Sequence, residues 1–335
     1  MIDLRSDTVT RPSAAMLAAM SGLDAGDTGD DVYDEDSTVH ALQERVAALL
    51  GHEAALFVVT GSLANLLAVR ALVPVGTEVL CDAQAHIARA ELGAHAAVHG
   101  ITMRTWSSPD GVVDPAAVEA MIAPDLGPFI VATAALSVEN THNFGGGAVQ
   151  PLDTLRSLRR VADAHGLAVH MDGARLWNAS VASRTPLQEY GAVADVVTVS
   201  LSKGLGAPVG SLLVGPADVV EESRVWRKRL GGGWRQAGVL AAAGLYALDH
   251  HVDRLADDHA HARLLAQACG VDMDSVDTNI VVVPCADAPV VVAAARRAGV
   301  LTSAVGPRAL RLVTHLDVSA ADARRAAQVL APLVA

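Results

Sequence analysis

The chain has 335 residues, 51% of them hydrophobic, and a formal net charge of −12. No apolar run reaches the roughly 18 to 20 residues that a membrane-spanning helix needs, and the first ten residues lack the apolar core of a signal peptide, so we expect a cytoplasmic protein with no membrane partner. The acidic balance argues against a nucleic-acid partner, and three widely spaced cysteines form neither a disulfide framework nor a metal motif.

The first twenty residues contain no helix–sheet unit, and we expect them to form an N-terminal arm. After them, short apolar runs alternate with amphipathic stretches. Helices are predicted after Gly61 and over residues 152–165. Strands are predicted over residues 54–60, 77–81, 129–138, 167–171, 196–200 and 209–214. Val-rich strands that alternate with helices are typical of a mainly parallel sheet covered by helices on both faces.

A different pattern occupies the C-terminal part of the chain. A long helical pattern over residues 236–269 leads into D-T-N-I-V-V-V-P, a helix near residues 287–298, the strand-like L-R-L-V-T-H-L and a last helix. This order predicts a small α+β domain. We therefore divide the chain into an arm (1–20), a large domain (21–245) and a small C-terminal domain (246–335).

Two charged residues follow neighbouring predicted strands. Asp172, in H-M-D-G-A-R, stands at the carboxyl end of a strand, where open α/β sheets bind ligands; alone, it is most simply a turn-capping acid paired with Arg175. Lys203, in S-L-S-K-G-L-G-A-P-V-G, is surrounded by small and apolar residues, and an unpaired lysine is costly to bury. An aspartate that faces a pyridinium nitrogen and a lysine that bonds to an aldehyde together bind pyridoxal phosphate.

A phosphate site is also required. The segment T-G-S-L-A-N (60–65) opens a helix after a strand, so its backbone N–H groups and Ser62 would suit a phosphate, although an ordinary helix cap has the same pattern. Ser202 and Arg235 are further phosphate candidates. His86, beyond the strand at 77–81, is either structural or a flat ring that stacks on the pyridine.

These strings together resemble the low-specificity L-threonine aldolases, a group of pyridoxal-phosphate enzymes of fold type I. The resemblance runs nearly end to end and includes M-I-D-L-R-S-D-T-V-T-R-P, G-D-D-V-Y, T-G-S-L-A-N, E-N-T-H-N, H-M-D-G-A-R, S-L-S-K-G-L-G-A-P-V-G, G-G-G-W-R-Q and L-R-L-V-T-H-L-D-V-S. It implies an α/β fold with a mainly parallel seven-stranded sheet sandwiched by helices. It also implies cleavage of L-threonine, L-allo-threonine and related β-hydroxy-α-amino acids to glycine and an aldehyde, and a homotetramer whose subunits share active sites.

The resemblance also implies residue roles. Lys203 would bond to the aldehyde of pyridoxal 5′-phosphate, Asp172 would pair with its ring nitrogen, and His86 would stack over the ring. His86 is the candidate base for the β-hydroxyl, directly or through a water, with Glu91 as the alternative. The expected phosphate ligands are Gly61, Ser62, Ser202 and Arg235, the last from a neighbouring subunit. The α-carboxylate would be held by Ser6, Arg175 and Arg311, with Arg175 also beside the cofactor and Tyr33 on the substrate side.

Some positions depart from the family pattern. Phe129 stands where family members commonly carry a histidine on the substrate hydroxyl side, and Arg89 and Ala90 precede the acid where many members have an aromatic residue. Either Phe129 only loosens discrimination between threo and erythro substrates, or Arg89 and Ala90 open the pocket to a larger or acidic side chain, as in phenylserine or 3-hydroxyaspartate.

Other functions remain open on the same residues. A racemase, a β-eliminating lyase or an aminotransferase would use the same lysine and aspartate, and a relative that has lost catalysis would keep them. No spacing of ligand residues indicates a metal.

Overall fold

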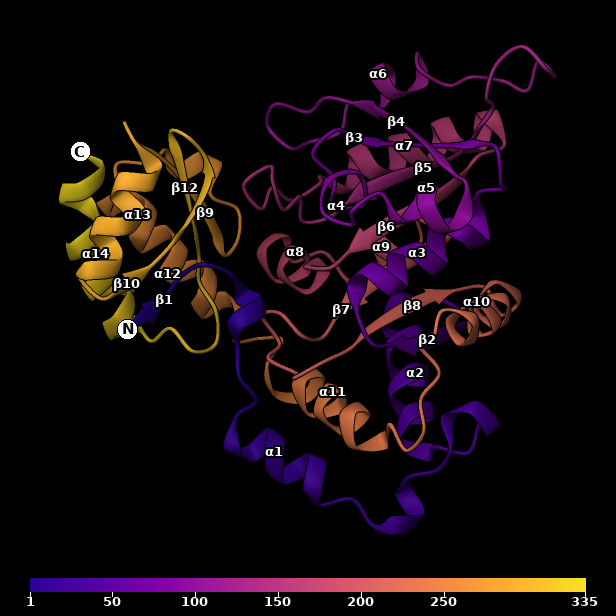
Figure 1. Ribbon diagram of the computed structural model, residues 1–335, viewed down its shortest axis with the longest axis horizontal. Helices are drawn as coiled ribbons and strands as arrows, with labels where there is room; N and C mark the ends of the chain where they lie inside the picture. Colours follow the sequence, from indigo (N-terminus) through magenta and orange to yellow (C-terminus); the bar gives the residue numbers. More distant parts are fainter.

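The computed structural model describes residues 1–335 and has two lobes, with the N-terminal strand and the C-terminal helix in the smaller one (Figure 1). The larger lobe is built on a seven-stranded sheet in the order β2-β8-β7-β6-β5-β3-β4. The pairs from β4 to β7 are parallel, and β8 runs antiparallel to both of its neighbours. The strands are β2 (Ala54–Val58), β3 (Glu78–Asp82), β4 (Thr102–Trp106), β5 (Thr133–Glu139), β6 (Ala168–Gly173), β7 (Val196–Ser200) and β8 (Ser211–Gly215). The predicted fold class is confirmed.

Helices cover both faces of this sheet, as the side-chain alternation along β2 shows. Leu56 and Val58 pack with α3 and α10 on one face, whereas Ala55 and Phe57 point to the opposite face, which α2, α7 and α9 cover. The helices of the large lobe are α2 (Ser37–Leu50), α3 (Gly61–Leu72), α4 (His86–Arg89), α5 (Ala94–His99), α6 (Pro115–Glu119), α7 (Leu152–His165), α8 (Leu176–Ser183), α9 (Leu187–Gly191), α10 (Ala217–Arg229) and α11 (Gly238–His250).

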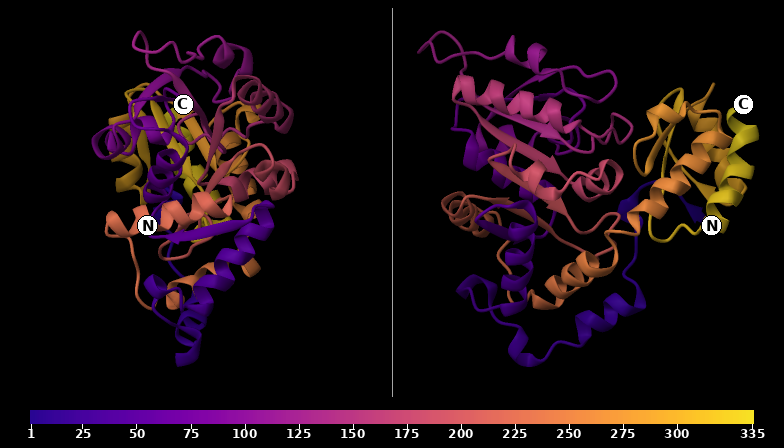
Figure 2. Two further views of the ribbon diagram at one scale, coloured as in Figure 1. Left: turned by 90° about the vertical axis from the view of Figure 1, so that its right-hand side faces the viewer. Right: turned by 180° about the vertical axis from the view of Figure 1, so that it is seen from behind.

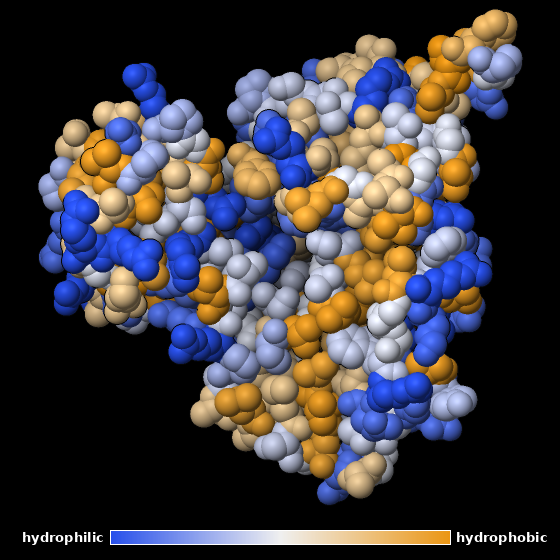
Figure 3. Space-filling model, viewed as in Figure 1, coloured by the Kyte–Doolittle hydropathy of each residue, from blue (hydrophilic) through white to orange (hydrophobic).

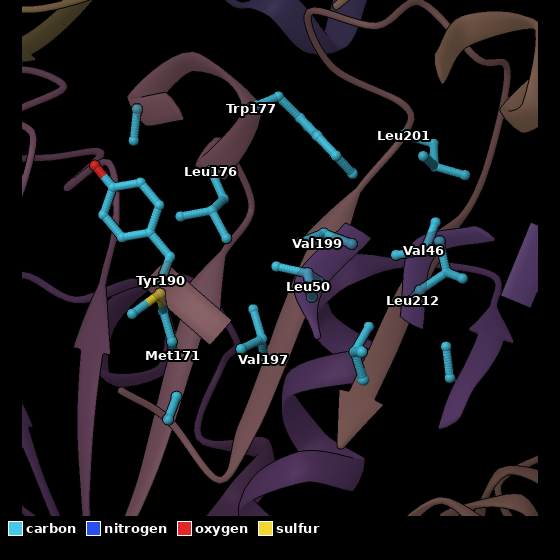
Figure 4. Packing of buried hydrophobic residues seen from close by; sticks show 14 of the residues in the cluster. Val46, Leu50, Met171, Leu176, Trp177, Tyr190, Val197, Val199, Leu201 and Leu212 are labelled. Atoms are coloured by element: carbon cyan, nitrogen blue, oxygen red, sulfur yellow. The ribbon is translucent and has the colours of Figure 1, made fainter. Parts of the chain in front are cut away.

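The second face carries the main hydrophobic core. Met171 from β6 lies beside Tyr190, and Val199 from β7 lies below Trp177, with Val197 of β7 and Leu50 of α2 in the same cluster (Figure 4). The predicted helix over 152–165 coincides with α7, which buries one apolar face and ends at Gly166 in the left-handed conformation (φ 66°). This packing fixes the sheet whose strand ends carry the site.

The small lobe joins residues from both ends of the chain. An antiparallel sheet in the order β11-β12-β9 packs with α12, α13 and α14, and β1 pairs in parallel with β10. The N-terminal segment then leaves this lobe and reaches α1, which packs against α11 of the large lobe (Figure 2). The bounds are β1 (Ile2–Asp3), α1 (Ala14–Ser21), α12 (Leu255–Ala268), β9 (Ile280–Pro284), α13 (Ala288–Arg297), β10 (Val300–Leu301), β11 (Ser303–Gly306), β12 (Ala309–Val313) and α14 (Ala320–Val334).

The boundary between the two lobes lies later in the chain than residue 246, where we expected it. That residue lies inside α11, whose Ala247 and Leu248 pack into the core of the large lobe, as does Leu255. Ala262 is the first residue after α11 that belongs to the core of the small lobe. The predicted continuous helix over 236–269 is interrupted between α11 and α12. No helix is long and apolar enough to cross a membrane.

Candidate active site

A polar pocket opens at the carboxyl ends of β5 and β6, between the two lobes. Hydrophilic residues gather in this hollow in the space-filling view (Figure 3). The N-terminal arm, the large lobe and the small lobe all contribute to its wall. The lining residues are Ser6, Thr8, His86, Ala90, Glu139, Asn143, Phe144, Asp172, Ala174, Arg175, Lys203 and Arg311. The structure therefore brings six of the predicted site residues to one place: Ser6, His86, Asp172, Arg175, Lys203 and Arg311.

Asp172 is the last residue but one of β6 and is held by two hydrogen bonds. The Asn65 side-chain amide donates to its Oδ2 at 2.8 Å, and the Ala174 backbone N–H donates to its Oδ1 at 3.0 Å. Asn65 is itself fixed by Thr198, whose hydroxyl donates to the amide oxygen at 2.6 Å. Both oxygens of this buried carboxylate are thus oriented before any ligand binds.

Lys203 follows β7 and lies on the same pocket. Its amine takes part in no ion pair of the chain, and Asp7, one of the acids that favour its charged form, is already paired with Arg175. Burial lowers the pKa of Lys203 below its ordinary value, and the Arg175 cation lowers it further, against the opposing effect of Asp172 and Asp7. A larger fraction of this amine is therefore neutral, and so nucleophilic, than in an exposed lysine.

The first turn of α3 is the candidate phosphate cradle. Thr60 caps the helix by accepting the Leu63 N–H at 3.1 Å, so the N–H groups of Gly61 and Ser62 stay free at the positive end of the helix. Asn65, on the same helix, reaches Asp172, which places this end of α3 beside the pocket. Ser202 precedes Lys203 directly.

His86 begins α4 and is held from two sides. Its backbone N–H donates to Glu139 at 2.7 Å, and its Nδ1 lies 2.9 Å from the Glu91 carboxylate. The hydrogen bond with Glu91 raises the pKa of His86, although burial opposes this. Glu91 does not line the pocket, and 1% of its side chain is exposed, so it cannot reach a substrate directly.

The two arginines of the pocket differ in how many of their donors are already used. Arg175 is buried and donates from Nε and Nη2 to Asp7, both at 2.7 Å, and from Nη1 to Asn143 at 3.0 Å. Burial alone would raise the pKa of Asp7, but Arg175 holds it well below its ordinary value. Arg311 has no acidic partner: its Nη1 donates to Asn143 at 3.1 Å and its Nη2 to the Arg5 carbonyl at 3.5 Å, and its Nε is buried without a partner.

Four predicted residues lie away from the pocket of their own chain. Tyr33 is 74% exposed, and the Arg235 side chain is 64% exposed and paired with Asp30. Arg89, at the exposed end of α4, does not line the pocket. Phe129 is 82% exposed in the loop before β5, at the end of that strand opposite Glu139. Neither Phe129 nor Arg89 therefore lines the pocket of its own chain, where the sequence led us to expect both beside the substrate.

Several residues that line the pocket or lie directly behind it had no predicted role. Asp7 was part of the quoted R-S-D-T string, Asn65 of T-G-S-L-A-N, and Glu139 and Asn143 of E-N-T-H-N. An acid that pairs with Arg175 from a distance of 168 residues leaves no local signal. Asn65 and Glu139 had a signal, since a polar residue inside an apolar helix or at a strand end needs a partner.

Comparisons with known proteins show a family and a shared fold. Residues 3–288 match the family described as Beta-eliminating lyase. The chain is 44% identical over 325 residues to the low specificity L-threonine aldolase of Escherichia coli (strain K12), covering 95% of each. It is 46% identical over 268 residues to an uncharacterized protein of Caenorhabditis elegans, of whose length it spans 64%. A solved structure, the threonine aldolase of Leishmania major, superposes with a TM-score of 0.87 over the whole of both chains at 21% identity, which shows a shared fold.

Proposed function

The chain belongs to the Beta-eliminating lyase family, and on that premise we propose that it cleaves L-threonine and L-allo-threonine to glycine and acetaldehyde. Pyridoxal 5′-phosphate is the cofactor, and related β-hydroxy-α-amino acids give the corresponding aldehydes. One observation carries the proposal: an amine without an acidic partner, Lys203, and an oriented carboxylate, Asp172, line the same pocket at the edge of the sheet.

The residues of the pocket fit this cofactor chemically. Lys203 offers an amine of lowered pKa to an aldehyde, Asp172 offers a carboxylate to a ring nitrogen, and the start of α3 offers free N–H groups to a phosphate. When bound, the cofactor supplies a protonated ring that accepts the electron pair released at the substrate Cα. Asp172 keeps the proton at that ring nitrogen, since Asn65 and the Ala174 N–H hold the carboxylate in place.

Arg311 is the main ligand of the substrate α-carboxylate in this proposal. Its guanidinium lines the pocket with no acidic partner, and its Nε has no hydrogen-bond partner. Arg175, in contrast, already donates two hydrogen bonds to Asp7. A planar guanidinium binds a carboxylate through two parallel hydrogen bonds. Arg175 and Ser6 complete the carboxylate site, and the fixed carboxylate sets which bond at Cα is cleaved.

Replacing Arg311 with lysine is expected to raise KM for L-threonine by about 10- to 100-fold, with a smaller change in kcat. The substitution keeps the charge and removes the bidentate contact, and a hydrogen bond to a charged group contributes about 1.5–3 kcal/mol. Steady-state kinetics of Arg311→Lys measure the effect. Arg308→Lys, at an exposed arginine outside the pocket, is the matched control and should match the wild type. An unchanged KM in Arg311→Lys would refute this assignment.

His86 takes the β-hydroxyl proton in the proposed reaction. It is the one imidazole on the pocket, and Glu91, the alternative base, is screened from it by burial. The aldehyde then leaves. The glycine part of the substrate stays in the pocket until its Cα is protonated.

We further propose that a second copy of the chain completes each site, within a cytoplasmic homotetramer. Tyr33 and Arg235 support this, because both are exposed, neither lines its own pocket, and the Asp31 N–H next to Tyr33 donates to the Arg235 carbonyl at 3.2 Å. One exposed patch thus presents both residues to a neighbour, where Arg235 would bind the phosphate.

Co-expression of two inactive variants tests the shared site. We expect Lys203→Ala and Arg235→Ala each to be inactive alone. When the two are co-expressed, up to about a quarter of the wild-type activity should return, because a hybrid dimer contains one site with both native residues. Separately purified chains that are mixed without subunit exchange provide the control. Absence of any recovery in verified hybrids would place Arg235 in its own chain's site or outside the reaction.

The residues that line the pocket also bear on the range of alternative substrates. Arg89 does not line the pocket, which weakens the reason to expect an acidic side chain, whereas Ala90 and Phe144 do line it. A larger apolar side chain therefore stays a candidate. Turnover of phenylserine and of 3-hydroxyaspartate, each relative to L-allo-threonine, separates the two cases.

A further inference from the structure

Two buried residues behind the pocket, Glu91 and His95, form a hydrogen-bonded unit with His86. The Nδ1 of His86 lies 2.9 Å from Glu91 Oε1, and the Nε2 of His95 lies 2.9 Å from Glu91 Oε2. Asn65 donates a further hydrogen bond to Glu91 Oε1 at 2.9 Å. The side chains of Glu91 and His95 are each 1% exposed, so neither meets the solvent or the substrate.

The protons in this unit can be assigned from the partners that each atom has. The Nδ1 of His95 is buried without a partner, so a proton there would be unsatisfied. His95 therefore carries its proton on Nε2 and donates it to Glu91. Burial alone would raise the pKa of Glu91, but the donors His86, His95 and Asn65 lower it to about 2, so Glu91 is a carboxylate that only accepts.

The Glu91 carboxylate likewise determines the tautomer of His86. A carboxylate at Nδ1 requires a proton on that nitrogen. The Nε2 of neutral His86 then has its lone pair free, and 29% of this side chain is exposed, on the pocket side. The orientation of one ring nitrogen by a buried carboxylate is the usual way to present the other nitrogen as a base.

We propose that Glu91 and His95 are positioning residues for the reaction: Glu91 holds His86 in the tautomer whose Nε2 accepts the β-hydroxyl proton, and His95 holds Glu91. This inference rests on the proposed function for the identity of the reaction, but the arrangement of the three side chains stands without it. Neither residue touches substrate or cofactor.

Other charged groups also face His86. Asp172 on β6 favours its cation, as Glu91 does, and Lys203 after β7 disfavours it; the Glu139 carboxylate on β5 accepts the His86 backbone N–H. Glu91 has the largest effect of these groups and raises the pKa of His86. Removing the Glu91 charge must therefore lower the pKa at which His86 loses its proton.

The test follows the His86 proton directly. Diethyl pyrocarbonate modifies an imidazole only in its neutral form, and mass spectrometry of the His86 peptide gives the midpoint pH in the full-length protein, before and after loading with pyridoxal 5′-phosphate. In Glu91→Gln, which keeps the shape and removes the charge, we expect the His86 midpoint to fall by about one pH unit or more. We expect kcat for L-allo-threonine to fall by about 10- to 100-fold, with KM within about threefold of the wild type.

Three further variants make the result specific. Glu91→Asp should recover part of the midpoint shift, and His95→Gln, which keeps a donor to Glu91, should shift it less than Glu91→Gln. His99→Gln is the matched control, because His99 is buried one helical turn after His95 but contacts no carboxylate. An unchanged His86 midpoint in a folded Glu91→Gln protein would overturn the inference. If the midpoint moves as expected but the wild type releases no aldehyde, the unit stands and the proposed function fails.

Discussion

Replacing Lys203 with alanine is expected to abolish aldehyde release, by at least ~10³-fold, while leaving the fold intact. The proposal gives Lys203 the bond to the cofactor, and loss of a covalent catalyst removes the whole pathway rather than one of several contributions. The fold should tolerate the change because the amine pairs with no acid, so its removal leaves no buried charge without a partner. Acetaldehyde measured with a coupled dehydrogenase, together with circular dichroism, tests both parts.

The chain offers a convenient check on the same lysine. It has only two lysines, Lys203 and Lys228. Borohydride reduction in the presence of pyridoxal 5′-phosphate should place the cofactor mass on the peptide that contains Lys203. Labelling of Lys228 alone, or full activity in Lys203→Ala, would contradict the role given to Lys203.

Replacing Asp172 with asparagine is expected to lower kcat on the order of 10²- to 10³-fold. Asparagine has nearly the same shape, but it cannot hold a proton at the ring nitrogen through a charge, and the loss of a single pre-organised electrostatic group typically has an effect of this size. Two donors, Asn65 and the Ala174 N–H, now bind the two carboxylate oxygens. In the variant, one of these donors would face the asparagine NH₂ group, which cannot accept a hydrogen bond.

Asp195→Asn serves as the matched control for Asp172→Asn. Asp195 directly precedes β7, at the edge of the sheet opposite Asp172, and pairs with Arg159. The same substitution there should leave kcat within about twofold of the wild type, since nothing on the pocket changes. Equal losses in the two variants would mean that Asp172 acts through stability alone, and no loss in Asp172→Asn would remove it from the mechanism.

The sheet could be predicted from the sequence wherever its strands are buried on both faces. Val-rich runs marked the strands from β5 to β8, whereas β4, a half-exposed edge strand with the sequence T-M-R-T-W, has no continuous apolar pattern and was missed. β5 begins at Thr133, four residues later than predicted, because hydrophobicity alone does not separate the exposed loop before it from the strand.

The site was predictable to the extent that topology determines it. Asp172 lies at the carboxyl end of β6 and Lys203 shortly after the carboxyl end of the parallel neighbour β7, so their meeting at one edge follows from the sheet. The pairing of Asp7 with Arg175 does not, because it depends on how the N-terminal arm returns from the small lobe. The hydrogen-bonded unit of His86, Glu91 and His95 was only partly predictable: Glu91 and His95 are four residues apart, but the contact of Asn65 with Glu91 joins parts of the chain 26 residues apart.

The central claim is that this protein breaks the Cα–Cβ bond of a β-hydroxy-α-amino acid and that this reaction depends on Lys203. Its most direct test is the product balance of the purified protein, loaded with pyridoxal 5′-phosphate and supplied with L-threonine or L-allo-threonine. We predict that glycine and acetaldehyde appear in equal amounts and that Lys203→Ala yields neither. Ammonia with a keto acid, or the inverted amino acid without aldehyde, would contradict the claim and identify a β-eliminating lyase or a racemase instead.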